Sequence, residues 1–293
     1  MIGQVLQEDG KAFRGVTPVV FLHGATAPFT TQTPVSPAGK FKIKGLRPGM
    51  YTLVVAVPYA GEMRKTVEVG PSFADARRQI AASVLFSSNP TRSYGVSTVE
   101  LSIPAQAQSD YHKAQELLSK RDVQGAVKYL RKAVARAPQF WTAWNNLGTI
   151  AYHLGHYEEA EQHFREALKY DPNSYEPLVN LGGALLSQGK IDEAFPINSR
   201  AVQSRPDDPL AHSQLGQNCF RLGDFDKAEE QLRLTKALDP AHFSFPQLIL
   251  AQIYEHRREY KLMTLELEDF LKLHPDSPRN DGIREQLEEA HSR

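Results

Sequence analysis

The second half of the chain repeats itself every 34 residues. The spacing is kept by one row of prolines and three rows of small residues: Pro138, Pro172, Pro206 and Pro240; Ala126, Ala160, Ala194 and Ala228; Gly148, Gly182 and Gly216; and Ala133, Ala167 and Ala201. A fixed period of this length predicts a stack of similar units, each burying its apolar face against its neighbours. Such a stack offers a long concave surface rather than a deep catalytic pit. The period therefore favours binding of another macromolecule.

The composition leaves room for a second domain and excludes several classes of protein. The chain has 293 residues, which suggests about two domains. Its 34 Lys and Arg balance 34 Asp and Glu, so the long-range field that attracts nucleic acid or anionic lipid is absent. No apolar run reaches the ~18–20 residues of a membrane-spanning helix. Cys219 is the only cysteine, which excludes an internal disulfide, and its place in the repeat predicts a buried apolar position.

Residues 1–103 show strand periodicity instead of the 34-residue period. Tyr51, Leu53 and Val55 fall on one face of a strand. Further short runs occur at 19–22, 40–43, 66–69 and 96–103, with glycines and prolines between them. This pattern predicts an antiparallel β-sandwich or barrel.

One segment of this half follows a known sequence pattern. From Gly39 to Leu53 the chain reads Gly-Lys-Phe-Lys-Ile-Lys-Gly-Leu-Arg-Pro-Gly-Met-Tyr-Thr-Leu. The segment resembles the core signature of the carboxypeptidase regulatory-like domain, a transthyretin-like β-sandwich, and the similarity covers residues 2 to about 70. The resemblance implies a non-catalytic module beside another domain, of a kind often found outside the cytoplasm. It transfers no catalytic residue to this chain.

The repeating unit resembles the tetratricopeptide repeat. The unit at 141–174 carries the marks of that family at Trp144, Leu147, Gly148, Gly155, Tyr157, Ala160, Phe164, Ala167 and Pro172. Gly148 and Ala160 let two antiparallel helices approach closely, Phe164 fills the space between them, and Pro172 ends the second helix. The third unit departs from this pattern: Asn198 stands where Phe164 stood, and Pro196 is expected to kink its second helix.

These patterns predict two domains of different class. We expect an all-β sandwich over 1–103, a linker or helix start at 104–108, and an all-α tetratricopeptide repeat solenoid over 109–277. The five units are expected at about 107–140, 141–174, 175–208, 209–243 and 244–277. Residues 278–293, with Ile283, Leu287 and Ala290 on one stripe, are expected to form a capping helix.

The motifs of common catalytic and metal sites are missing from the sequence. It contains no phosphate-binding loop, no His-Glu-x-x-His motif, no Gly-x-Ser-x-Gly elbow and no Cys-rich zinc pattern. His153, His156 and His163, with Glu159, are the densest histidine group, and we interpret them as solvated or capping residues. We therefore predict no catalytic residue, no metal and no cofactor.

A row of carboxamides points to a binding groove. Asn146, Asn180 and Gln214 share one register of the first helices, the helices that line the concave side in the tetratricopeptide repeat family. A carboxamide both donates and accepts, so such a row can pair with an extended peptide backbone without reading its sequence. The alternative is that asparagine is simply common at this position. Tyr152 and Phe220 are the aromatic groove candidates, and Asn145, Gln217 and Arg221 complete the predicted set.

We predict from this a non-enzymatic adaptor or scaffold whose groove binds a protein or extended peptide, without nucleic acid or membrane insertion. The alternative is a cell-envelope or surface module whose sandwich binds carbohydrate through Tyr59, Phe73 and Tyr94. The sandwich resemblance favours the cell envelope or periplasm if the N-terminus is processed or truncated, and the cytoplasm otherwise. The sequence leaves the partner and the oligomeric state open.

Overall fold

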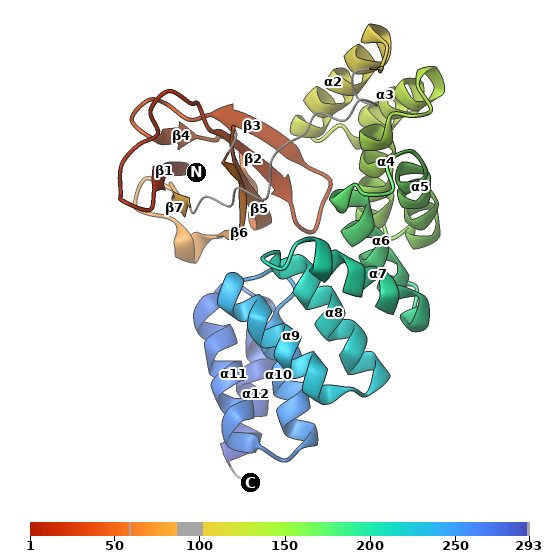
Figure 1. Cartoon of the computed structure of the whole chain (residues 1–293). Helices are drawn as coiled ribbons and strands as arrows, with labels where there is room; N and C mark the ends of the chain where they lie inside the picture. Colours follow the sequence, from red (N-terminus) through yellow and green to blue (C-terminus); the bar gives the residue numbers. More distant parts are fainter. Residues whose placement is uncertain (59, 87–101, 292–293) are drawn as a thin grey trace. The chain divides into compact units, whose positions relative to one another are not determined.

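The computed structural model describes residues 1–58, 60–86 and 102–291. The described residues fall into two compact units, residues 1–172 and 173–293. The first unit therefore contains the strands and the first two helix pairs, and the second contains the remaining helices (Figure 1). The two units are described separately below.

The N-terminal strands form two sheets that share one core, as expected. The four-stranded sheet has the order β3-β2-β5-β6 and contains β2 (Val19–Gly24), β3 (Thr30–Pro34), β5 (Gly49–Val57) and β6 (Gly61–Val69). The three-stranded sheet has the order β4-β1-β7 and contains β1 (Ile2–Gln7), β4 (Lys40–Lys42) and β7 (Ala81–Phe86). Val5 and Phe86 of the smaller sheet join Leu22 and Leu53 of the larger sheet in one buried cluster. Burial of both inner faces explains the alternation seen in the sequence.

One strand pair differs from the antiparallel arrangement expected. β1 pairs with β7 in parallel, with Ile2 opposite Ala81 and Gln7 opposite Phe86. Parallel strands need a long connection, and here almost the whole sandwich lies between the two. A short 3-10 helix, η1 (Pro71–Phe73), precedes β7. Most of the strand expected at 96–103 lies outside the described residues, which resume at 102.

Five helix pairs follow, each with the first and second helices of one repeat. The helices are α2 (Ala105–Ser119) with α3 (Val123–Arg136), α4 (Trp141–His153) with α5 (Tyr157–Tyr170), α6 (Tyr175–Ser187) with α7 (Ile191–Ser204), α8 (Pro209–Leu222) with α9 (Phe225–Leu238), and α10 (Pro246–His256) with α11 (Tyr260–Leu273). The last helix, α12 (Asn280–His291), buries Ile283 and Ala290. Residues 105–108 already belong to α2, and Pro104 is the residue directly before this helix. Proline is tolerated there because the N–H groups at a helix start have no partner within the helix.

The helices within a pair meet where the sequence predicted close contact. A Cβ built on Gly148 would stand 2.5 Å from the Phe164 ring, and one built on Gly216 would stand 2.8 Å from Leu232. The alanine row that begins with Ala126 is fully buried. In the third pair, Gly182 meets Asn198 instead of an apolar side chain. α7 continues through Pro196 from Ile191 to Ser204.

Candidate protein-interaction face

The predicted groove residues of the first unit lie on α4 and are engaged with neighbouring side chains. Asn145 is buried, and Asn146 is half-buried. The Nδ2 of Asn146 donates to the Tyr111 hydroxyl on α2 at 3.2 Å, so this amide connects the first two repeats. The Tyr152 ring is half-buried, with its centroid 5.3 Å from that of Tyr157.

The predicted residues of the second unit lie on α6 and α8. Asn180 is half-buried on α6. Gln214 is 8% exposed, and its Oε1 is buried near Gly182 without a hydrogen-bond donor among the described residues. Phe220 is half-buried with its ring centroid 5.7 Å from that of Phe225. The exposed Arg221 donates from Nη1 to the carbonyl oxygen of Leu186 at 2.7 Å, which joins α8 to the end of α6.

Gln217 begins a chain of hydrogen bonds that runs inward from α8. Its Nε2 donates to the Ser213 hydroxyl at 3.1 Å, and that hydroxyl donates to the Ser244 hydroxyl at 2.7 Å. The Ser244 Oγ lies 2.6 Å from Nδ1 of His242, which can accept its proton when the ring is neutral. Burial lowers the pKa of His242 to about 4, against an opposite effect of Asp208. The backbone N–H of Ser244 also donates to Nδ1, so in the tautomer protonated at Nε2 the hydrogen bonds all run from Gln217 toward His242.

Ser213, Ser244 and His242 were not predicted as site residues. A signal for Ser213 existed, because it continues the row Tyr111, Asn145 and Val179 at the 34-residue spacing. His242 and Ser244 lie in the connection before α10, where the fifth unit shifts by one residue and the row ends. We call Ser213, Gln214, Gln217, Phe220 and Arg221 the α8 face.

The histidine group predicted to be solvated or capping divides between solvent and buried positions. His156 is exposed, and its Nδ1 lies 3.7 Å from a Glu159 carboxylate oxygen, with His163 Nε2 3.4 Å from the other. His153 is half-buried at the end of α4, its Nδ1 has no hydrogen-bond partner among the described residues, and burial lowers its pKa to about 4. In the described residues no group of three or more His, Cys, Asp or Glu side chains is arranged to hold a metal ion.

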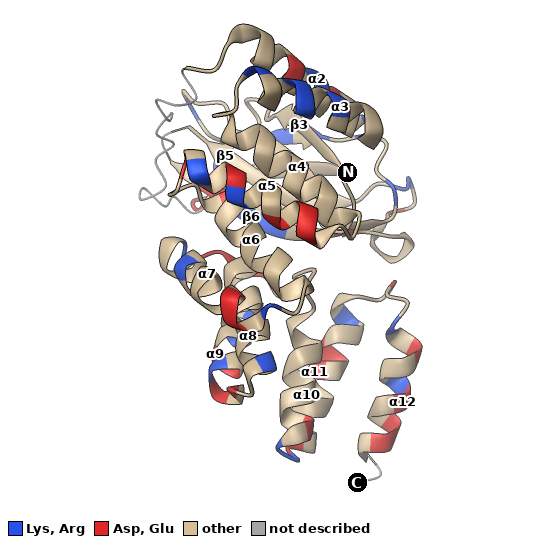
Figure 2. Ribbon diagram, turned by 90° about the vertical axis from the view of Figure 1, so that its right-hand side faces the viewer, with Lys and Arg blue, Asp and Glu red and all other residues tan. Residues whose placement is uncertain are grey.

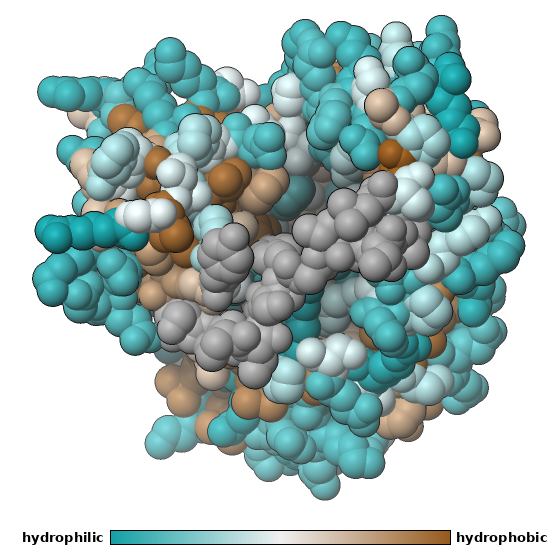
Figure 3. Space-filling model, turned by 45° about the horizontal axis from the view of Figure 1, so that its top comes forward, coloured by the Kyte–Doolittle hydropathy of each residue, from teal (hydrophilic) through white to brown (hydrophobic). Residues whose placement is uncertain are grey.

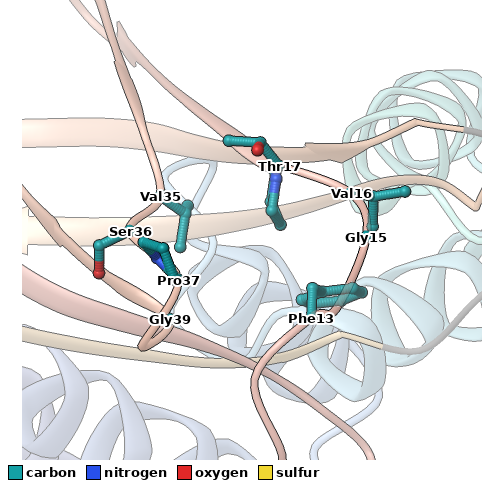
Figure 4. A pocket seen from close by; sticks show the side chains of 9 residues that line it. Phe13, Gly15, Val16, Thr17, Val35, Ser36, Pro37 and Gly39 are labelled. Carbon is teal, nitrogen blue, oxygen red and sulfur yellow. The ribbon is translucent and has the colours of Figure 1, made fainter.

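The described part of the sandwich contains a small cavity between the connection before β2 and the connection from β3 to β4. It has a volume of about 190 Å³ and is lined by Phe13, Gly15, Val16, Thr17, Pro18, Val35, Ser36, Pro37 and Gly39 (Figure 4). Phe73, one of the aromatic residues predicted for carbohydrate binding, does not line it. Phe73 is 37% exposed in η1, and Tyr59 and Tyr94 lie outside the described residues. Carbohydrate binding by the sandwich stays a prediction.

Surface charge and hydropathy are mixed rather than concentrated. Figure 2 shows both basic and acidic residues on α12 and on the helices of the first repeats. On the face drawn in Figure 3, hydrophobic residues form small patches among hydrophilic ones. Across the described ranges, no helix combines the length and apolar character needed to span a bilayer.

Family models match the helical part of the chain. One described as tetratricopeptide repeat matches residues 111–175 and 154–209, and a second with the same description matches residues 185–253. Among curated proteins, the chain is 26% identical over 118 residues to the BBSome complex member BBS4 of Bos taurus, covering 40% of this chain and 22% of that protein. It is 30% identical over 95 residues to the Hsp70-Hsp90 organizing protein of Triticum aestivum, covering 32% of this chain and 16% of that protein. The chain therefore spans less than a quarter of either relative.

Solved structures share the fold of the helical part. YrrB, described as a TPR protein with an unusual peptide-binding site, superposes with a TM-score of 0.51 at 22% identity, covering 61% of this chain and 92% of its own. PilW, described as a type IV pilus biogenesis factor, gives a TM-score of 0.58 at 19% identity. The superposition covers 64% of this chain and 87% of PilW. At these identities the likeness concerns the fold.

The paired helices, their small-residue contacts and the constant period define a helical repeat protein of the solenoid class. Residues 111–253 match models of the tetratricopeptide repeat, which agrees with the helical solenoid seen in the structure. Modules of this kind are typically non-catalytic. The resemblance of residues 2–70 to the carboxypeptidase regulatory-like domain stays a prediction.

Proposed function

We propose that the protein is a non-enzymatic adaptor, and that the α8 face, together with Asn180 on α6, binds an extended segment of a partner protein. The observation that carries this proposal is the hydrogen-bond chain from Gln217 to His242. It holds a half-buried amide in a fixed orientation on the first helix of a repeat. A fixed polar group loses less entropy on binding than a free one.

The chemistry of the α8 face suits a peptide backbone. Gln217 and Arg221 carry donors for the carbonyl oxygens of a peptide, whereas Oε1 of Gln214 is buried near Gly182. Phe220 adds an apolar contact for one side chain of the segment. YrrB, whose fold is similar, is described as having a peptide-binding site, which supports a peptide as the class of ligand.

Asn145, Asn146 and Tyr152 on α4 form a second proposed contact region. Asn146 binds the Tyr111 hydroxyl, so a partner would compete for that amide or use its remaining polar atoms. We expect the contribution of α4 to be smaller than that of the α8 face for this reason.

Selection of a random peptide library on the full-length protein tests the proposal. Peptides that bind are then measured against the variant Asn180→Ala, Gln217→Ala, Arg221→Ala. Each hydrogen bond lost contributes about 0.5–1.5 kcal/mol, so the affinity should fall by roughly one to three orders of magnitude. Glu288→Ala on α12 is the control and should leave Kd unchanged. A folded triple variant that binds the selected peptides as tightly as the unchanged protein would exclude the α8 face.

A second variant separates the two rows of polar residues. Asn146→Ala, Asn180→Ala, Gln214→Ala removes the carboxamide row and keeps Gln217 and Arg221. If the row clamps the peptide backbone, this variant loses affinity to a similar degree. If it loses none while the first variant does, binding rests on Gln217 and Arg221 and the row is a structural feature of the repeats.

A further inference from the structure

The turns between paired helices share a left-handed residue, and two of them use arginine. Gly155, Gly189 and Gly223 have φ angles of +80°, +76° and +80°. Arg121 holds the same place in the first pair with φ +64°, and Arg258 in the fifth with φ +60°. A residue with a Cβ is disfavoured in this region, and glycine is the residue that takes it at least cost. An arginine at this turn position is therefore unfavourable for the backbone, and contacts of its side chain could compensate for that cost.

Arg121 reaches the core of the sandwich. Its guanidinium carbon lies 4.4 Å from the centroid of the Phe29 ring, and its Nη2 donates to the Tyr51 hydroxyl at 3.0 Å. That hydroxyl in turn donates to the carbonyl oxygen of Arg47 at 2.9 Å. Phe29 and Tyr51 are both buried and meet edge to face. A planar cation can stack on one ring and hydrogen-bond beside it, which an ammonium group does less well.

A second contact lies one repeat further along. His153, at the end of α4, interacts with the backbone of Ala25, in the connection between β2 and β3. Both contacts lie inside the first compact unit, residues 1–172. They join the strands to the first two helix pairs within this unit.

We propose that the sandwich and the first two helix pairs share a fixed intramolecular interface, and that Arg121 is the positioning residue that holds it. Arg121 takes a turn position that glycine occupies in the next three pairs, because only a long planar cation placed there meets both Phe29 and Tyr51. Arg258, its counterpart in the fifth pair, is exposed, and its side chain makes no hydrogen bond or ion pair with the described residues. This proposal does not depend on peptide binding by the α8 face.

Arg121→Gly in the full-length protein tests the interface, and Arg258→Gly is the matched control. Glycine suits this turn in three other repeats, so both variants should fold. The reporter is the ring of His153, titrated by NMR, because burial at the interface holds its pKa at about 4. We expect Arg121→Gly to raise this pKa toward the ordinary ~6.5 and Arg258→Gly to leave it unchanged.

A double-mutant cycle measures the contact directly. Arg121→Gly and Tyr51→Phe are combined, and the folding equilibrium constants of all four proteins are compared by urea unfolding. One hydrogen bond predicts a coupling of about 3- to 10-fold. The proposal is overturned if Arg121→Gly leaves the pKa of His153 unchanged and shows no coupling to Tyr51→Phe, since Arg121 would then behave like Arg258.

Discussion

Asn198 and Asn218 hydrogen-bond to each other in the interior of the second unit. The Nδ2 of Asn198 donates to Oδ1 of Asn218 at 3.0 Å, and both residues are 0% exposed. The Nδ2 of Asn218 donates in turn to the carbonyl oxygen of Ile191 at 2.9 Å. An amide pair thus stands where Phe164 and Leu232 fill the second and fourth pairs.

Asn198→Ala should destabilise the second unit by about 1–3 kcal/mol. The change leaves Oδ1 of Asn218 buried without a donor, which costs more than the bond itself contributed. Urea unfolding followed by far-UV circular dichroism measures the loss. Combining it with Asn218→Ala should cost less than the two single changes added together, because they share one bond. Strict additivity would mean that the two amides do not interact.

Gly148→Ala should destabilise the second helix pair by roughly 1–3 kcal/mol. The new methyl group would overlap the Phe164 ring, which is buried and cannot move freely. Trp141 and Trp144 lie on the same helix, so their fluorescence reports the unfolding. Gly282→Ala is the control on α12, where nothing lies within 4 Å of the added atom. It should stabilise the helix by about 0.5–1 kcal/mol, and equal effects at the two glycines would contradict the packing.

Acid should destabilise the second unit through His242. Its folded pKa of about 4 lies below the ordinary 6.5, so the unfolded chain binds more protons between these values. The contribution of His242 to the free energy of unfolding is fully present above about pH 6.5, and it is lost as the pH falls toward 4. At pH 5 the loss amounts to about 2 kcal/mol, from roughly 1.5 pH units at ~1.4 kcal/mol each.

Urea midpoints at pH 7 and pH 5 measure this loss. His242→Asn keeps an acceptor near the Ser244 hydroxyl but cannot titrate, so its stability should change less between the two values, by about 2 kcal/mol. An equal decline in both proteins would assign the acid sensitivity to other groups.

Sequence reasoning reached the repeats because their contacts are local. Gly148 meets Phe164 sixteen positions later in the same unit, so the period carries the contact. The strands could be predicted for a similar reason, because burial of one face of a strand imposes alternation of apolar and polar residues along the sequence. The parallel pairing of β1 with β7 was not, because it joins the two ends of the sandwich.

The contact between Arg121 and Tyr51 was also out of reach, as it joins residues 70 apart with no shared period. Only the left-handed turn left a trace, in the row that runs from Arg121 through Gly155, Gly189 and Gly223. The partner of Asn198 was hidden in the same way. An asparagine at a position where other repeats have phenylalanine indicates a polar group in the interior. Only the packed helices show that Asn218 is its hydrogen-bond partner.

Pro196→Ala should stabilise the second unit by about 2–2.6 kcal/mol. Proline in a helix interior costs ~3 kcal/mol relative to alanine, because it lacks the N–H that bonds the carbonyl four residues earlier, here Asp192. Alanine loses more unfolded-state entropy on folding, which removes ~0.4–1 kcal/mol of the gain. Pro196 is exposed, so little packing is lost.

Pro177→Ala on α6 is the matched comparison for this change. Pro177 is the third residue of its helix, where an N–H has no partner within the helix, and it is buried. Its replacement should therefore bring no gain and a small loss of packing. Urea unfolding of both variants by circular dichroism gives the difference. If Pro196→Ala instead lowers the free energy of unfolding, α7 has adapted its geometry to the proline, and the amide pair at Asn198 depends on that geometry.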